Sequence, residues 1–157
     1  MAGVVYMTAE RAREIEEELK ELKGKGRRFI AQKIAEARSH GDLSENAEYD
    51  AAKEEQGLHE LKISKLESQL ARAEIIKAED LPNDKVYILT KVKIKNLKNN
   101  GIMEYTLVSD EEADFEKRKL SVTSPIGKAL MGKVIGDKVE INAPAGKMMF
   151  EVLEIGK

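Results

Sequence analysis

The sequence predicts a two-domain α+β protein, in which a long antiparallel α-helical hairpin precedes a small antiparallel β-sheet domain with one short helix. Three observations predict this fold class. Apolar residues recur every three or four positions in the first half of the chain and every two positions in the second half, and a polar segment with Pro82 separates the halves. The predicted boundaries are 1–78 for the hairpin, 79–84 for a linker and 85–157 for the second domain.

The first helix is expected over residues 8–40, with Thr8 as its N-cap. Gly24 and Gly26 interrupt a run of good helix formers, but the apolar stripe resumes beyond them at four-residue spacing, which indicates a stutter within one continuous helix. Gly41 is expected in a left-handed conformation just after the helix end. The stripe consists of Ala12, Ile15, Leu19, Leu22, Ile30, Ile34 and Ala37.

The second helix is expected to begin with Asp42 or Ser44 as its cap and to end near Ala78. Its apolar positions alternate by three and four residues, which is typical of a coiled-coil seam. Two helices of about 30 residues make a hairpin roughly 45 Å long, with the residues that join them at its tip. The seam consists of Tyr49, Ala52, Gln56, His59, Ile63, Leu66, Leu70 and Ala73.

The second domain is predicted from alternating apolar residues and from turn residues. Asn100-Gly101 indicates a hairpin turn between two strands. Ser124 and Pro125 are typical of a helix start, and the short helix that follows is expected to stop at Gly132. Strands are expected over residues 86–96, 102–110, 133–142 and 147–157.

The composition argues against several classes of function. The chain has no cysteine and two histidines, of which His59 lies on the apolar seam and is expected to be packed, so a self-contained zinc site is not expected. Three Phe, four Tyr and no Trp argue against a base-stacking platform. No apolar run approaches the ~20 residues of a membrane span, and the N-terminus lacks the apolar core of a signal peptide, so a cytoplasmic protein is expected.

The charges are concentrated in two adjacent segments. Residues 20–40 carry seven bases against two acids, which gives the first helix a basic end. Residues 40–57 then carry one cation, Lys53, against six carboxylates at a helix break, where they repel one another. The six are Asp42, Glu45, Glu48, Asp50, Glu54 and Glu55.

Each of these charges also has a purely structural explanation. Asp42 and Glu45 have the spacing of a capping box, and a helix N-terminus favours acids. Asp50, Glu54 and Glu55 are expected to form a solvated face. The bases of the first helix are explained equally well by solvation of a long exposed helix.

Four segments together resemble a known family. GDLSENAEY at the predicted tip, with DEEADF, SVTSPIGKALMGK and a terminal FEVLEI in the second half, resembles the bacterial Gre transcript-cleavage factors, GreA type, over the whole chain. The resemblance implies an N-terminal coiled coil and a C-terminal domain of FKBP-like fold. It also implies a monomeric accessory factor, itself no enzyme, that docks at the rim of the secondary channel of bacterial RNA polymerase. The coiled coil would then reach the active centre and stimulate Mg²⁺-dependent cleavage of backtracked RNA at its 3′ end.

The resemblance also implies site residues at the tip. Asp42 and Glu45 would be the acids donated to the polymerase active site, where they would share a Mg²⁺ ion with the polymerase. Mg²⁺ typically takes one or two protein carboxylates beside phosphate oxygens and water, and two-metal hydrolysis needs an oriented water. How the two acids divide the work stays open. Tyr49 would brace the tip or contact RNA.

Other site residues follow from position or from the second domain. Arg38 and Lys53 flank the tip on opposite helices and are expected to contact RNA phosphates. Ser124 and Pro125 match the polymerase-docking turn of the family, although Thr123 stands where the family often has Asp or Asn. The alternative for Ser124 and Pro125 is a helix start with no further role.

Three rival functions remain open. The first is a Gre-like secondary-channel protein that inhibits or modulates the polymerase without cleavage. Its support is an acidic tip: Ser44 stands where the family often has Lys, and Asp50 where it often has His. The spaced Asp42 and Glu45 favour stimulation instead. The second is a prolyl isomerase, but the second domain offers few aromatic side chains for such a pocket, and fold alone is a poor warrant. The third is a coiled-coil adaptor, which leaves the tip chemistry unexplained.

Overall fold

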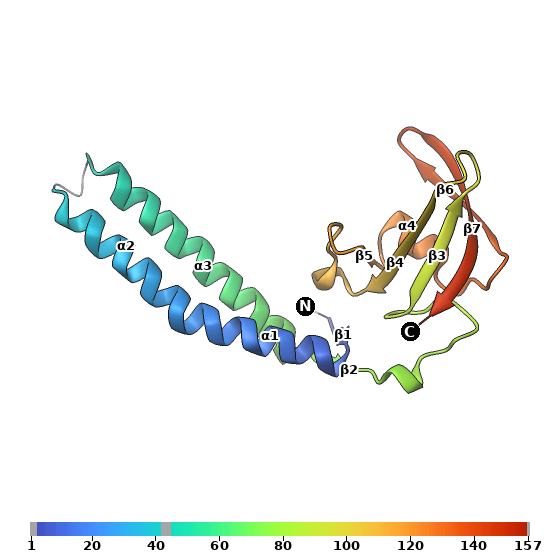
Figure 1. Ribbon diagram of the computed structural model, residues 1–157, viewed down its shortest axis with the longest axis horizontal. Helices are drawn as coiled ribbons and strands as arrows, with labels where there is room; N and C mark the ends of the chain where they lie inside the picture. The colour runs from blue at the N-terminus through green and yellow to red at the C-terminus, as the bar shows by residue number, and fades with distance from the viewer. Residues whose placement is uncertain (1–2, 42–44, 157) are drawn as a thin grey trace. The chain divides into compact units, whose positions relative to one another are not determined.

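The computed structural model describes residues 3–41 and 45–156 of the chain (Figure 1). Two compact units are present: Glu10–Arg72 form one, and the residues before and after this segment form the other. The first unit is a helical hairpin and the second is built on a five-stranded sheet, so the predicted two-domain α+β class is confirmed. The hairpin unit ends at Arg72, ahead of the predicted boundary at residue 78.

The first arm of the hairpin is one continuous run of helix in three parts. Helix α1 spans Ala9–Glu21, a π-helical segment η1 spans Leu22–Gly26, and helix α2 spans Arg27–Ser39. The π segment contains both glycines, and its wider turn shifts the phase of the apolar stripe, so the predicted stutter is confirmed. The arm ends at His40, and Gly41 follows with φ +128°, in the region that glycine favours.

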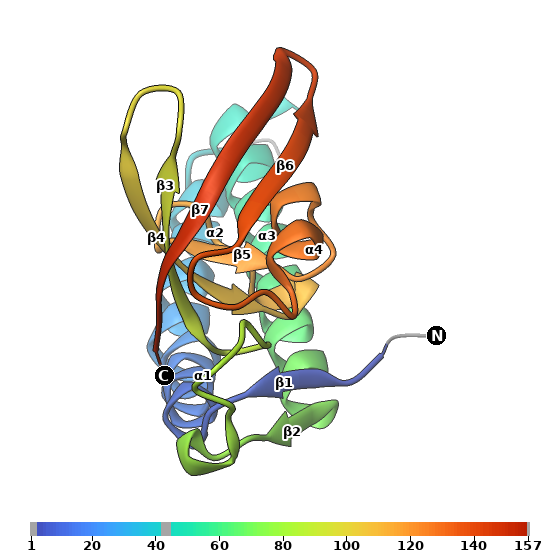
Figure 2. The ribbon, with the colours of Figure 1, turned by 90° about the vertical axis from the view of Figure 1, so that its right-hand side faces the viewer.

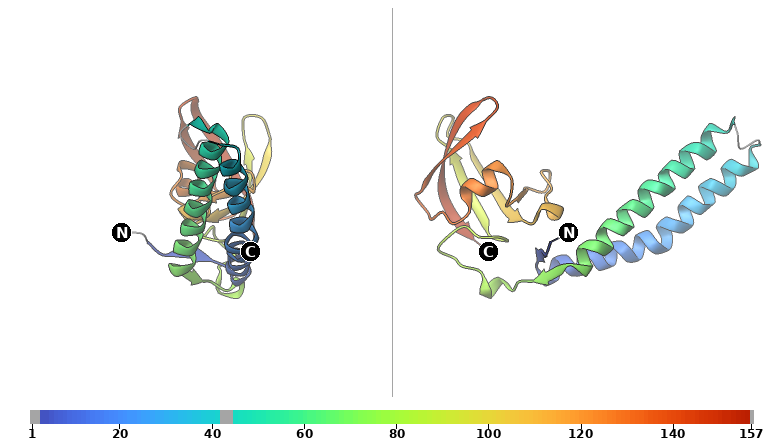
Figure 3. Two further views of the ribbon diagram at one scale, coloured as in Figure 1. Left: turned by 90° about the vertical axis from the view of Figure 1, so that its left-hand side faces the viewer. Right: turned by 180° about the vertical axis from the view of Figure 1, so that it is seen from behind.

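The second arm, helix α3 (Ala47–Ala71), begins later and ends earlier than predicted. Its N-cap is Asn46, so the prediction of Asp42 or Ser44 as the cap is wrong, and both of those residues lie outside the described part of the chain. The predicted end near Ala78 is also wrong, because strand β2 (Ala73–Ile75) pairs in parallel with strand β1 (Val5–Met7). Figures 1 and 3 show α2 and α3 side by side.

The π segment and α3 interlock at one histidine. His59 is half-buried on the seam and its Nε2 donates a hydrogen bond to the Leu22 carbonyl at 2.7 Å. A methyl group at Gly26 would lie 2.6 Å from Cε1 of the His59 ring, so glycine at this position makes room for the imidazole. The expectation that His59 is packed is therefore confirmed.

Charged pairs join the two arms along their exposed edges. Arg27 donates two hydrogen bonds to Glu60, at 2.8 and 3.0 Å, and these lower the pKa of the Glu60 carboxyl. Further interhelical pairs are Lys23–Glu67, Lys33–Glu55 and Lys62–Glu18. Exposed ion pairs contribute little individually, so the apolar seam is what holds the arms together.

None of the helices in the described residues is long and apolar enough to cross a membrane.

The sheet has the strand order β5-β4-β3-β7-β6 (Figure 2). The strands span Lys119–Ser121 (β5), Ile102–Val108 (β4), Lys91–Asn96 (β3), Gly146–Gly156 (β7) and Lys138–Ala143 (β6). Neighbours are antiparallel except β4 and β5, which are parallel. Short 3₁₀ turns, η3 (Ala78–Asp80) and η4 (Asp110–Glu112), complete the unit.

Two predicted strands begin later in the structure because turns occupy their first residues. Leu89 has φ +70°, and the Thr90 hydroxyl donates to the Tyr87 carbonyl at 2.6 Å, so the chain turns before β3 instead of extending from residue 86. Gly132 and Gly136 have positive φ, which delays β6 from residue 133 to Lys138. The predicted hairpin between β3 and β4 is confirmed.

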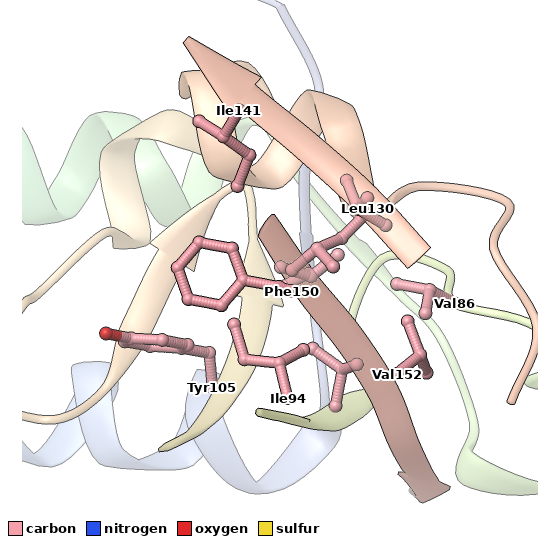
Figure 4. Close-up of a cluster of buried hydrophobic side chains, with 10 residues drawn as sticks. Val86, Ile94, Tyr105, Leu130, Ile141, Phe150 and Val152 are labelled. Carbon is pink, nitrogen blue, oxygen red and sulfur yellow. The ribbon is translucent and has the colours of Figure 1, made fainter. Parts of the chain in front are cut away.

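Helix α4 (Pro125–Leu130) closes one face of the sheet through a hydrophobic core (Figure 4). Phe150 on β7 is completely buried at the centre, where Tyr105, Ile94 and Leu130 surround it. Leu130 is the helix's contribution and is also completely buried. This packing fixes α4, and with it the residues at the start of α4, relative to the sheet.

Candidate functional site

The first part of the candidate site is the hairpin tip, residues 40–46, between α2 and α3. Asp42 lies outside the described residues, so its predicted role stays a prediction. Glu45 is exposed and directly precedes the N-cap residue of α3. In the described part of the chain no hydrogen bond or ion pair engages the Glu45 carboxylate, which leaves it available to a partner.

Asn46 connects the ends of both helices. Its Oδ1 accepts a hydrogen bond from the Tyr49 backbone N–H at 3.1 Å, which caps α3. Its Nδ2 donates to the Ala37 carbonyl of α2 at 2.5 Å. Sequence reasoning missed this residue, although an Asn directly before a helical segment is a recognisable cap candidate.

Tyr49 and Arg38 come together across the hairpin. Tyr49 is half-buried and packs against a small core formed by Ile30, Ile34 and Ala52. The Arg38 guanidinium carbon lies 5.8 Å from the centre of the Tyr49 ring, within the range of a cation–π interaction. The two predicted site residues therefore support each other at the base of the tip.

Lys53 has a different partner from Arg38. Its ammonium donates to Gln56 Oε1 at 2.7 Å, on the same helix, and the side chain is exposed. Arg38 thus has an aromatic partner on the opposite helix, Tyr49, whereas the partner of Lys53, Gln56, lies on the same helix as Lys53.

Two of the carboxylates near the tip have basic partners. Glu48 Oε2 lies 2.6 Å from Nδ1 of His40, and Glu55 pairs with Lys33 at 3.0 Å. Glu55, expected on a solvated face, is therefore ion-paired across the helices. These contacts offset part of the self-repulsion that the sequence predicts, while Glu45, Asp50 and Glu54 are exposed.

A metal site formed by this chain alone is not found in residues 3–41 and 45–156: no group of three or more His, Asp or Glu side chains there is placed to hold an ion. A carboxylate at the tip could supply one ligand of a site that a partner completes, which fits the small number of protein carboxylates that Mg²⁺ takes.

The second part of the candidate site is the turn that opens α4. Ser124 is the N-cap, as predicted: its Oγ accepts from the Gly127 N–H at 3.1 Å and donates to the Ser121 carbonyl at 2.6 Å. Pro125 is the first residue of α4, and its side chain is exposed. We call Ser124-Pro125 the docking turn.

A carboxylate that the sequence did not single out lies beside the docking turn. The hydroxyls of Ser121 and Thr123 both donate to Oδ1 of Asp110. These hydrogen bonds, first from Ser121 and then from Thr123, lower the pKa of Asp110, and Lys128 adds a smaller attraction. Thr123, which departs from the family pattern, therefore holds a negative charge next to the turn by binding Asp110.

Family models match nearly the whole chain. The model described as the N-terminal domain of transcription elongation factors covers residues 5–75. The model described as the C-terminal domain of transcription elongation factors GreA/GreB covers residues 81–157. The first match contains the hairpin and the second contains the five-stranded sheet.

Curated relatives are similar over their full length. Transcription elongation factor GreA of Chlorobium phaeobacteroides (strain BS1) is 52% identical over 157 residues, covering 99% of this chain and 98% of the relative. The factor of the same name from Flavobacterium johnsoniae is 52% identical over 155 residues, with the same coverage.

Solved structures with related sequences align over much of the chain. The transcription factor Gfh1 is 26% identical, with a TM-score of 0.49 and 99% coverage of both chains. GreA/GreB from Nitrosomonas europaea is 29% identical, with a TM-score of 0.44, and the match covers 69% of this chain and 94% of that one. The family models and the curated relatives, taken with the hairpin and the sheet domain, show that this chain belongs to the GreA/GreB family of transcription elongation factors.

Proposed function

We propose that this transcription elongation factor brings the carboxylates of its hairpin tip into the active centre of RNA polymerase and there stimulates the cleavage of backtracked RNA. The observation that carries the proposal is the exposed Glu45 carboxylate, placed directly before a helix whose start is fixed by Asn46. The factor is an accessory protein, and the hydrolytic machinery belongs to the polymerase.

In this proposal Glu45 and Asp42 act as ligands and as orienting groups. A Mg²⁺ ion shared with the polymerase would supply charge neutralisation and a water of lowered pKa. The two carboxylates would accept hydrogen bonds from the attacking water and so orient it toward the scissile phosphodiester, and the exposed position of Glu45 permits such contacts. In this hydrolysis the water oxygen would bond to phosphorus as the bond from phosphorus to the ribose 3′ oxygen breaks. The water loses one proton, and the departing oxygen takes one up to become the 3′ hydroxyl.

The remaining residues hold the complex together. The docking turn, with exposed Pro125 and the neighbouring Asp110 carboxylate, contacts the rim of the polymerase secondary channel. Arg38 and Lys53 contact phosphates of the extruded 3′ RNA. The Tyr49 ring holds the Arg38 guanidinium in place through their cation–π contact. One copy of the chain is sufficient, and it works in the cytoplasm beside the transcribing polymerase.

Backtracked elongation complexes with 3′-labelled RNA test the proposal. Addition of the wild-type chain with Mg²⁺ is expected to release short labelled fragments, and Asp42→Ala and Glu45→Ala are expected to abolish the release while competing normally for the polymerase. Tight binding of the wild type without fragment release would contradict the proposal and favour a channel-blocking inhibitor.

A further inference from the structure

Asn46 makes two hydrogen bonds that lead to different helices. The Tyr49 N–H of α3 donates to its Oδ1 at 3.1 Å, and its Nδ2 donates to the Ala37 carbonyl of α2 at 2.5 Å. The same carbonyl also accepts from the His40 N–H at 3.2 Å. The last carbonyls of a helix lack the N–H four residues ahead that would bind them within the helix, and Asn46 gives this one a second donor, so one side chain binds an end of each helix.

Only the first of these bonds is needed to cap α3. Asp and Ser cap a helix as well as Asn does, because each offers an oxygen to a backbone N–H near the helix start. Neither can replace the second bond. An ionised Asp has no donor, and the Ser hydroxyl can donate but ends one bond closer to the backbone, too short to reach α2 while it caps α3. An amide has a donor and an acceptor on the same short side chain, which is what the two contacts require.

The bond to Ala37 is also not needed to hold the arms together. Tyr49, Ile30, Ile34 and Ala52 already pack between α2 and α3 next to the tip. What the bond adds is local: it fixes the residue that directly follows Glu45 to the carbonyl of Ala37, a buried residue in the last turn of α2. Asn46 itself is half-buried and extended, with φ −95° and ψ +97°.

We propose that Asn46 is a positioning residue for transcript cleavage: its side-chain amide ties the Glu45 end of the tip to α2 and so sets where the Glu45 carboxylate is presented. This inference rests on the function proposed above. A carboxylate displaced by about an ångström loses alignment with metal and water, and such a displacement costs up to about a hundredfold in rate.

Two variants remove the bond to Ala37 and keep the cap. Asn46→Asp has the shape of the native side chain and loses the donor. Asn46→Ser keeps a hydroxyl group for the cap but is shorter by one bond, and it adds no charge. Ile63→Val is the matched control, because it weakens a completely buried seam contact of the same hairpin away from the tip. Each chain is assayed full-length for three quantities: single-turnover RNA cleavage at saturating factor, competition for polymerase, and the Mg²⁺ concentration that gives half-maximal cleavage.

Both Asn46 variants are expected to cleave about ten- to a hundredfold more slowly than wild type and to need more Mg²⁺, while competing normally for polymerase. Ile63→Val is expected to cleave like wild type. Wild-type cleavage and Mg²⁺ dependence in Asn46→Ser and Asn46→Asp would overturn this inference and leave the proposed function standing. An equal loss in Ile63→Val would overturn it as well, since hairpin stability would then explain the effect. A wild-type chain that stimulates no cleavage would overturn both.

Discussion

Asp110 illustrates how single side chains prepare a surface for binding. It is exposed, yet two hydroxyl groups, from Ser121 and Thr123, hold its carboxylate in place beside the docking turn. Because hydroxyl donors favour the ionised form, the pKa of Asp110 lies below its ordinary value. A carboxyl group whose pKa is lowered by folding stabilises the folded state above the pKa of the unfolded chain, about 3.9, and that contribution is lost as the pH falls through the lowered value.

Substitution of the donors is therefore expected to raise the pKa of Asp110. Ser121→Ala should shift the Asp110 titration upward more than Thr123→Val does, because the Ser121 hydroxyl is the larger cause of the lowered pKa. Carboxyl ¹³C chemical shifts followed by NMR between pH 2 and 6, a range set by the ~3.9 reference value, measure both shifts. An Asp110 pKa that stays at its wild-type value in both variants would show that these hydrogen bonds do not form in solution.

At the tip, the sequence predicts which acids act, but it does not predict the contacts that position Glu45. The motif around Asp42 and Glu45 predicts the chemistry through its residue types and spacing, and that role stays a prediction. The role of Asn46 depends on the Ala37 carbonyl, nine positions earlier, being within reach of its amide. That distance depends on how the two helices pack at the tip, and no pattern in the sequence carries it. The cap was misassigned for a related reason: Asp42, Ser44 and Asn46 are all good cap residues, and the loop geometry decides among them.

At the scale of elements, the π segment η1 is the feature on which the hairpin's register depends. It joins α1 and α2 without a break, and the His59 ring of α3 fills the space above Gly26 while donating to the Leu22 carbonyl. The two glycines of this segment differ: a methyl group at Gly24 would meet nothing within 4 Å, and one at Gly26 would overlap the imidazole.

The two glycine-to-alanine variants should therefore differ in their effects on stability. Gly26→Ala is expected to lower the free energy of unfolding by about 1–3 kcal/mol, because overpacking displaces His59. Gly24→Ala is expected to leave stability unchanged or raise it by up to about 1 kcal/mol, as alanine is the better helix former. Thermal unfolding followed by circular dichroism at 222 nm compares them, and equal melting temperatures for the two variants would contradict the account of the π segment.

Elements with a periodic pattern or a clear cap signal could be predicted, and the three-residue strands could not. The hairpin arms and the strands β3, β4 and β7 carry enough residues for their periodicity to be read. The strands β1, β2 and β5 have three residues each, too few to show an alternation. Residues 73–78 continue good helix-forming sequence, yet β2 forms there because β1 pairs with it, so tertiary pairing overrides local propensity.

At the scale of the whole molecule, the two units have separable tasks in the proposed function. The docking turn belongs to the sheet unit, where the core around Phe150 and Leu130 fixes α4. The carboxylates belong to the hairpin unit. A substitution in the docking turn should therefore change the affinity for polymerase and leave the cleavage rate at saturation unchanged. A substitution of a tip carboxylate should do the reverse.

Pro125→Ala tests this separation from the docking side. Loss of an exposed proline is expected to weaken the affinity for polymerase about tenfold, through lost contact and a less ordered turn, and to leave cleavage at saturating factor unchanged. Cleavage measured across a range of factor concentrations separates the two quantities. A reduced rate at saturation would mean that the docking turn also affects the chemistry.

The most direct test of the central claim is the rate of single-turnover RNA cleavage at saturating factor with Glu45→Gln. This substitution keeps the size of the side chain and removes its charge, and the side chain is exposed, so folding and polymerase binding should be preserved. If Glu45 is donated to the polymerase active centre, the rate falls by about a hundredfold while the concentration for half-maximal binding stays the same. A variant that cleaves at the wild-type rate would contradict the claim that this carboxylate takes part in the reaction.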